Sequence, residues 1–335
     1  MSTCLVKVTR GPVVESKHRG NIVIADTNGN VQTSIGDAHN VTYFRSAAKP
    51  IQGLNVILSG AADTFGFTDK ELAIMCSSHY GESMHRETIY GILKKIGCTE
   101  KDLLCGSPLS IREEVREQQL REHTPIDSTC SDCSGKHSGF LAVCRAKNYP
   151  IENYNSPDHP MQKELLSIIG YMCGIDPTRI LIGIDGCSVP VHALPISCMA
   201  TGYARLASPD KLDEPYRSAC KRIFRAINAY PEMLAGTRGF CSDFLKATDG
   251  KFVAKLGAEA VYCIGFAEKG LGLTVKIEDG NFRALYPTVM RSLSDLDWLT
   301  PSALSSLKRF VCPDNINDKG DPIGKIKPVF HLKKQ

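Results

Sequence analysis

Ser46 and Lys49 have the residue types and the spacing of an acyl-transfer pair. Three residues apart on a helix, they lie on one face, and the amine comes within reach of the hydroxyl. Free serine is a poor nucleophile, and a neutral amine beside it can accept its proton. Pro50 is tolerated only near the start of a helix, which places that start close to Ser46. The hydroxyl then faces unpaired N–H groups and the positive end of the helix dipole, where developing negative charge is favoured.

Two later segments extend this pattern. A serine-bearing loop, Ser77-Ser78-His79, follows the S-x-x-K motif, and a K-x-G motif begins at Lys255 on a late apolar stretch. Serine β-lactamases and penicillin-binding proteins arrange their catalytic motifs in this order. Each motif alone is common, and the ordinary role of a serine such as Ser46 is to cap a helix. The order of the three motifs favours serine–lysine catalysis.

The composition is that of a globular protein. Of 335 residues, 42% are hydrophobic and 23% are charged, so neither disorder nor membrane insertion is indicated. The 40 basic and 36 acidic residues are interspersed, and no basic stripe suggests a nucleic-acid partner. No stretch has the length of a signal peptide or a membrane span, so we expect a cytoplasmic protein. In that compartment the fourteen cysteines are expected to be reduced.

The elements that would position these residues form an α+β pattern. An Asn-Gly turn between two apolar runs predicts an N-terminal hairpin, and strands return over about 250–280. Between them, the apolar spacing over about 46–230 is mostly helical. We therefore expect an antiparallel sheet from both chain ends, about 1–45 and 250–280, with a central helical region, in a serine β-lactamase/penicillin-binding-protein-like fold. This fold would form one unit over residues 1–335, with a proline-containing loop as its last segment.

A dense group of reactive side chains precedes an apolar helix. Its members are Cys130, Cys133, Lys136 and His137. A single C-x2-C pair without a second pair does not complete a closed structural zinc site. Asp185 and Cys187 add a carboxylate and a thiol in a later loop. Taken alone, these thiols are more typical of core residues. The lysine is more typical of a charged group in solvent, and Asp185 could equally cap a turn.

The full set of motifs resembles the rhizobial-type, or class 3, L-asparaginases of the asparaginase II family. The matching segments are residues 45–50, 77–79, 133–137, 185–187 and 255–259. The resemblance covers most of the chain. It implies a fold similar to serine β-lactamases and glutaminases, a homodimer, and hydrolysis of the side-chain amide of L-asparagine to L-aspartate and ammonia.

The resemblance also assigns roles to individual residues. Two serine–lysine tandems would carry catalysis, namely Ser46 with Lys49 and Ser78 with Lys255. The residues lining the substrate pocket would be Arg45, His137, Asp185 and Cys241. A zinc ion would be held by Cys133, Lys136 and Cys187, with one position open to water. We expect the zinc to be accessory and no organic cofactor to be needed.

We expect Ser46 to attack the amide and Lys49 to act as its base. That role requires a neutral amine, and burial near a second cation, Lys255, would lower the lysine pKa in the required direction. Ser78 would relay a proton. Two alternatives stay open at this point: another cytoplasmic serine amidase such as a glutaminase, and a non-enzymatic zinc or thiol-redox protein built around Cys130, Cys133 and Cys187.

Overall fold

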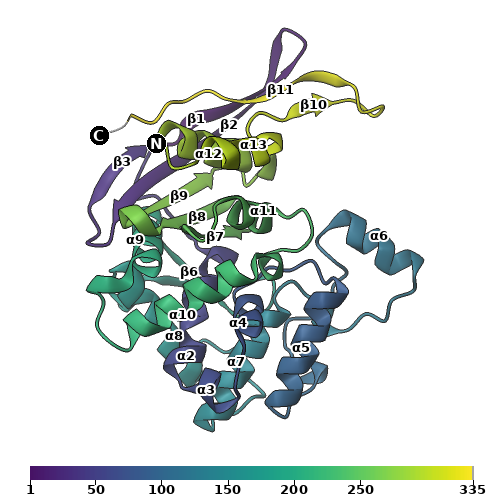
Figure 1. The fold of residues 1–335 in the computed structure, drawn as a ribbon, viewed down its shortest axis with the longest axis vertical. Coiled ribbons are helices and arrows are strands. Elements are labelled where there is room, and N and C mark those ends of the chain that lie inside the picture. The colour runs from purple at the N-terminus through teal and green to yellow at the C-terminus, as the bar shows by residue number, and fades with distance from the viewer. Residues whose placement is uncertain (334–335) are drawn as a thin grey trace. The chain divides into compact units, whose positions relative to one another are not determined.

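The computed structural model describes residues 1–333 and contains two compact units (Figure 1). The first unit holds Met1–Ala47, Leu194–Ser208 and the chain from Asp243 onward, and the second holds Ala48–Ala193 and Pro209–Ser242. The first unit thus takes both ends of the chain, as the sequence predicts. None of the helices in the described residues is long and apolar enough to cross a membrane.

An antiparallel sheet forms the body of the first unit. The strand order is β10-β11-β1-β2-β9-β8-β7, and β3 pairs with β2. The strands are β1 (Thr3–Arg10), β2 (Val13–Asp26), β3 (Val31–Ile35), β7 (Phe252–Gly257), β8 (Val261–Phe266), β9 (Leu271–Ile277), β10 (Asp314–Ile316) and β11 (Pro322–Pro328); β4 (Val41–Tyr43) lies outside this sheet. The predicted α+β class, with an antiparallel sheet drawn from both ends of the chain, is therefore confirmed.

The prediction of a loop for the C-terminal segment is wrong, because β10 and β11 form there. β11 pairs with the edge of β1, where Lys7 lies opposite Lys327. Its prolines stand at the two ends of the strand, and a proline is tolerated at the start of a strand or on an edge. This strand exists because a partner edge is available, and the local sequence does not encode that edge.

Helices cover both faces of this sheet: α9 (Ile196–Ala207) and α12 (Phe282–Asp295) lie on opposite sides (Figure 1). Gly265 and Gly272 allow the close approach of α9, because a Cβ on Gly272 would come within 1.8 Å of the Ala200 oxygen. Since both faces are covered, every residue of β8 is buried. A strand covered on both faces is apolar along its whole length, without an exposed polar alternate. α13 (Pro301–Ser306) also belongs to this unit, and α11 (Phe240–Ala247) joins it from Asp243 onward.

The second unit is mainly helical, as predicted for the middle of the chain. Its helices are α1 (Lys49–Gln52), α2 (Leu54–Leu58), α3 (Ala61–Thr64), α4 (Asp69–Met75), α5 (Ser83–Lys95), α6 (Glu113–Arg121), α7 (Ser134–Lys147), α8 (Pro160–Cys173) and α10 (Tyr216–Ala229). Two strands, β5 (Leu181–Ile184) and β6 (Pro190–Pro195), form a hairpin. The first eleven residues of α7 are all buried, so this helix lies at the centre of the unit.

Candidate active site

The predicted catalytic residues are distributed over the two units. Ser46 and Lys255 belong to the first unit, and Lys49 and Ser78 belong to the second. Ser46 lies in a 3₁₀ turn, Arg45–Ala48, and Lys49 opens helix α1 with Pro50 in its first turn. The predicted helix start close to Ser46 is confirmed.

In the first unit, the turn that carries Ser46 lies against strand β7. A Cβ on Gly257 would come 2.9 Å from the Phe44 oxygen and 3.1 Å from the Ala47 nitrogen. Only glycine lets the two backbone segments approach this closely. Lys255 precedes Gly257 on the same strand, is buried, and donates through Nζ to the carbonyl of the next residue at 2.8 Å. The strand that bears Lys255 is therefore packed against the Ser46 turn.

The backbone beside Ser46 is strained. Arg45 has φ of +50°, in the left-handed region that residues with a Cβ seldom adopt. A conformation of this kind costs about 1–3 kcal/mol and persists only where the surroundings hold it. One such restraint is Tyr203 of α9, whose hydroxyl donates to the Ala47 carbonyl at 2.7 Å. Strain next to a candidate nucleophile is consistent with a functional role for this turn.

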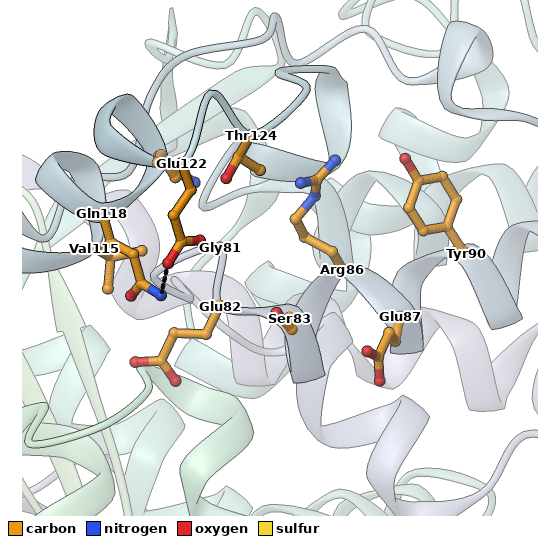
Figure 2. A pocket seen from close by; sticks show the side chains of 11 residues that line it. Gly81, Glu82, Ser83, Arg86, Glu87, Tyr90, Val115, Gln118, Glu122 and Thr124 are labelled. Atoms are coloured by element: carbon orange, nitrogen blue, oxygen red, sulfur yellow. Dashed lines mark hydrogen bonds between the residues drawn. The ribbon is translucent and has the colours of Figure 1, made fainter.

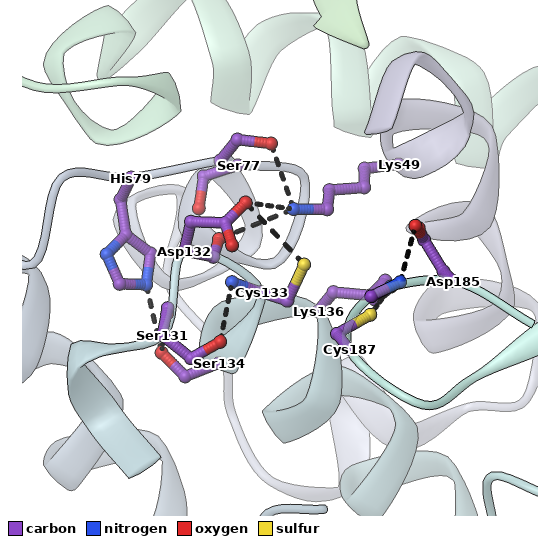
Figure 3. Close-up of polar contacts among 12 residues, drawn as sticks. Lys49, Ser77, His79, Ser131, Asp132, Cys133, Ser134, Lys136, Asp185 and Cys187 are labelled. Carbon is purple, nitrogen blue, oxygen red and sulfur yellow. Dashed lines mark hydrogen bonds and ion pairs between the residues drawn. The ribbon is translucent and has the colours of Figure 1, made fainter. Parts of the chain in front are cut away.

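In the second unit, the Lys49 amine is surrounded by oxygen acceptors (Figure 3). Lys49 is 1% exposed, and its Nζ donates to Ser78 Oγ at 2.9 Å, to the Asp132 carbonyl at 3.3 Å and to Asp132 Oδ2 at 3.5 Å. An ammonium group has three protons, and here each has an acceptor. The structure thus pairs Lys49 with Ser78, a pairing that the sequence analysis did not predict.

Asp132 is a site residue that the sequence analysis missed. It stands inside the dense segment of cysteines, serines and Lys136, one residue before Cys133. This position, among reactive side chains, was the signal in the sequence that could have identified Asp132 as a site residue.

The pKa of Lys49 is raised above its ordinary value. Burial lowers it, but the electrostatic effects of the Cys133 sulfur and the Asp132 carboxylate raise it by more, and the second cation Lys136 opposes them only in part. We expected a lowered pKa, and that expectation is wrong. The reason is that the Cys133 sulfur and the Asp132 carboxylate lie close to the amine, which the spacing of motifs could not reveal.

The loop that carries Ser78 is held from both sides. Ser77 Oγ donates to the Ile74 carbonyl at 2.6 Å, and the Ser78 N–H donates to the Leu234 carbonyl at 3.0 Å. The N-terminus of α7 packs directly on this loop, because a Cβ on Gly135 would come 2.1 Å from the Ile74 oxygen. Glycine at this position therefore brings the end of α4 and the start of α7 together, and with them Ser78 and Asp132.

His79 is neutral and holds the same loop in place through two hydrogen bonds of its ring. Its Nδ1 accepts from the Gly81 N–H at 3.1 Å, so Nε2 carries the proton and donates to Ser134 Oγ at 2.9 Å. The ring stacks on His85 at a centroid distance of 5.0 Å. Burial, together with the nearby His85 and Lys49, lowers the pKa of His79 well below its ordinary value.

A thiol–amine cluster lies next to this loop. Lys136 Nζ donates to Cys187 Sγ at 2.9 Å, and Cys133, Lys136 and Cys187 are all at least 94% buried. The Cys133 thiol and then the Lys136 ammonium lower the pKa of Cys187 against burial, whereas Cys187 and burial raise the pKa of Cys133. These shifts favour a thiolate at Cys187 paired with the Lys136 ammonium.

The donor set of this cluster fits zinc in its chemistry. Zn²⁺ is bound by thiolate sulfur and by nitrogen ligands, and Cys133, Lys136 and Cys187 supply two sulfurs and one nitrogen. Among residues 1–333, no group of three or more His, Cys, Asp or Glu side chains could hold a metal ion. Zinc here would therefore need Lys136 as its third ligand, after loss of the lysine proton.

The predicted substrate residues are divided between the units. Asp185 and His137 lie in the second unit, where Asp185 contributes to raising the pKa of Lys136. The Asp185 carboxylate also accepts the Gly186 N–H at 2.9 Å, so its turn-capping role is present as well. Arg45 belongs to the first unit, and Cys241 is buried in the first turn of α11.

A separate pocket of about 390 Å³ lies between α5 and α6 (Figure 2). It contains none of the predicted site residues. Several of its polar side chains are bonded within the pocket or to nearby groups: Gln118 donates to Glu122, Glu82 accepts from Thr237, and Arg86 pairs with Asp127. It therefore presents no paired nucleophile and base, and we place the candidate site at Lys49 and Ser78.

Comparison with known proteins gives one match over nearly the whole chain. A family model described as L-asparaginase II matches residues 6–328. Among curated proteins, none matches at a significant level.

Solved structures resemble the chain only loosely. A candidate β-lactamase from Bacteroides dorei is 10% identical, with 81% of this chain and 92% of that one aligned and a TM-score of 0.44. Simvastatin synthase (LovD) from Aspergillus terreus is 12% identical, with 87% of this chain and 91% of that one aligned and a TM-score of 0.40. Native Mglu is 14% identical, with 87% of this chain and 63% of that one aligned and a TM-score of 0.34. Superpositions this loose carry no argument, so the specific likeness to β-lactamases stays a prediction.

The lowered pKa of His79 predicts a loss of stability in acid. The unfolded chain takes up a proton near pH 6.5, whereas the folded protein resists it, so the stabilisation is complete above about pH 6.5 and falls as pH decreases. We expect His79→Gln to reduce the slope of unfolding free energy against pH, between pH 6.5 and 5, by up to about 1.4 kcal/mol per pH unit. Urea unfolding at each pH measures this slope.

The exposed His39 supplies the control, because His39→Gln removes an imidazole without touching the buried loop. That variant should keep the wild-type slope. A His79→Gln slope equal to that of the wild type would show that His79 already binds a proton in the folded protein.

Proposed function

The chain belongs to the L-asparaginase II family, a family of asparaginase-like amidohydrolases, and from this premise we propose that it hydrolyses L-asparagine to L-aspartate and ammonia. The observation that carries the proposal is the buried hydrogen bond of 2.9 Å between Lys49 Nζ and Ser78 Oγ. An amine directed at a hydroxyl in a dry environment is the arrangement that serine–lysine acyl transfer requires. Ammonia release from asparagine by the purified protein tests it.

In the proposed mechanism, Ser46 attacks the carboxamide carbon and forms an ester with the aspartyl group. Lys49 accepts the Ser46 proton and passes it to Ser78 Oγ, while Ser78 gives its own hydrogen to the departing nitrogen, which leaves as ammonia. In this proposal Lys255 is the lysine of the second tandem, which the family resemblance assigns to Ser78. Backbone N–H groups near Ser46 stabilise the negative oxygen of the tetrahedral intermediate. Water then hydrolyses the ester, releasing aspartate and restoring the serine.

Substrate recognition would use opposite charges. In this proposal Asp185 binds the α-ammonium group and Arg45 the α-carboxylate, because charge-assisted hydrogen bonds are strong and directional. His137 and Cys241 line the pocket. Glutamine is longer by one methylene, and fixing its α-groups at the same two points displaces its amide from Ser46. An apolar pocket discriminates one methylene by only about 1–3 kcal/mol, whereas a misplaced reacting group costs more.

Serine–lysine catalysis predicts large losses from single substitutions. We expect Ser46→Ala and Lys49→Met each to lower kcat for asparagine by at least about 10³-fold, because the nucleophile or its base is removed. The matched controls are Ser167→Ala and Lys163→Met on the exposed face of α8, which should keep wild-type rates. Full turnover by Ser46→Ala together with loss in Ser78→Ala would reverse the assignment of the nucleophile.

The raised pKa of Lys49 predicts an alkaline rate profile. The base must be neutral, and below its pKa the neutral fraction rises tenfold for each pH unit. At saturating asparagine, the initial rate of ammonia release should therefore increase from pH 7 to pH 9, by up to about tenfold per unit. A rate that is flat or falls over this range would contradict Lys49 as the base.

We propose that zinc binds to Cys133, Lys136 and Cys187 as an accessory group. Two thiolates and an amine leave the metal nearly neutral, so its bound form would chiefly order the loops around the substrate. Removal of zinc by a chelator should raise KM more than it lowers kcat. Elemental analysis should find about one zinc per chain, unchanged by Cys312→Ser at the exposed cysteine and lost with Cys187→Ser. Complete loss of kcat in correctly folded metal-free enzyme would argue for a metal-activated water instead.

A further inference from the structure

We propose that Asp132 is a positioning residue that holds the Lys49 amine against Ser78. This inference rests on the proposed function, since it gives a role to a residue of the same site. Neither the motif pattern nor the family resemblance pointed to Asp132.

The contacts of Lys49 define the role. A lysine side chain has a flexible four-carbon stem, and its amine can turn toward many acceptors. Here two of the three acceptors come from Asp132, through its carbonyl at 3.3 Å and Oδ2 at 3.5 Å. With these two directions occupied, the remaining hydrogen of the amine points to Ser78 Oγ at 2.9 Å.

The charges around Lys49 call for a carboxylate at this point. Lys49 is 1% exposed and shares its surroundings with a second buried amine, Lys136, and with His79. A buried cation without a counter-charge is strongly unfavourable. The sulfur atoms of Cys133 and Cys187 also act on this amine electrostatically, but only Asp132 places a carboxylate oxygen within 4 Å of the amine among the contacts in the described part of the chain.

The Asp132 side chain is not used to cap a helix. An aspartate just before a helix ordinarily accepts a backbone N–H of the first turn. The N-cap of α7 is Cys133, whose side chain makes no capping hydrogen bond. The Cys133 N–H donates to Ser131 Oγ at 3.4 Å. Asp132 Oδ2 instead accepts from the Cys133 thiol at 3.6 Å, so one oxygen contacts both that thiol and the Lys49 amine.

The turn beneath Asp132 is rigid, which suits a positioning role. Ser134 Oγ donates to the carbonyls of Thr129 at 3.1 Å and of Ser131 at 2.8 Å. Asp127 caps the preceding 3₁₀ turn and is paired with Arg86. A group held on such a turn keeps the geometry of its partner to a fraction of an ångström.

Kinetics of Asp132 variants provide the first test. We expect Asp132→Asn to lower kcat for asparagine by about 10- to 100-fold while KM changes little, because the amine is misdirected and not removed. This kcat is compared on the alkaline plateau of the pH profile, where Lys49 is neutral with or without the carboxylate. Asp132→Ala should lose more, and Asp132→Glu should recover part of the loss. Asp158→Asn, at an exposed aspartate, should leave both constants unchanged. Wild-type kcat in Asp132→Ala would overturn the proposal.

A double-mutant cycle tests the contact without using activity. Asp132→Asn, Lys49→Met and the double variant are compared by the midpoint of urea unfolding. If Asp132 serves Lys49, then Asp132→Asn should lower the midpoint in the wild-type background and change it much less once Lys49 is methionine. The exposed pair Asp158 and Lys163, at 3.9 Å, gives the control cycle and should be close to additive.

The two tests separate the inference from the proposed function. A non-additive cycle in a protein that does not hydrolyse asparagine would sustain the Asp132–Lys49 coupling and reject the proposed activity. An additive cycle would overturn the positioning role even if asparagine is hydrolysed.

Discussion

A lysine amine buried away from water is the constraint on which the rest of the second unit depends. An unpaired buried charge is too unfavourable to persist, so the surrounding chain must supply acceptors in the right directions. Lys49 obtains them from a serine 29 residues away and from an aspartate 83 residues away. Three segments must therefore meet at one point: the end of α4, the turn before α7 and helix α1.

Small residues and main-chain hydrogen bonds make that meeting possible. Gly135 has no Cβ that would clash with the Ile74 carbonyl, so the start of α7 can lie directly on the Ser78 loop. Neutral His79 then bonds the loop to Ser134 at the same helix start. The first unit uses the same principle, because Gly257 lets the strand of Lys255 approach the strained turn that holds Ser46. In both units the reactive side chains stand on backbone that is fixed independently of them.

The charges of the site are coupled, and their coupling decides which chemistry is available. Asp132 favours the charged form of Lys49, while Lys136 stabilises a thiolate at Cys187. The proposed base catalysis by Lys49 would thus begin from an ammonium and depend on pH. The proposed zinc would have to displace the lysine proton before Lys136 could serve as a ligand. These two requirements distinguish this site from a simple serine–base pair.

The sequence by itself determined the chemical inventory and the broad layout. The S-x-x-K, C-x2-C and K-x-G motifs, the Asn-Gly hairpin and the return of strands near residue 250 are local patterns, and local patterns can be recognised without a structure. Only the tertiary structure decided that Lys49 faces Ser78 and Asp132, that its pKa is raised, and that β11 adds to the edge of β1. These features depend on groups remote in the chain that come within a few ångströms. Hydrogen bonds and Coulomb interactions act over such short distances, whereas residue spacing carries no record of them.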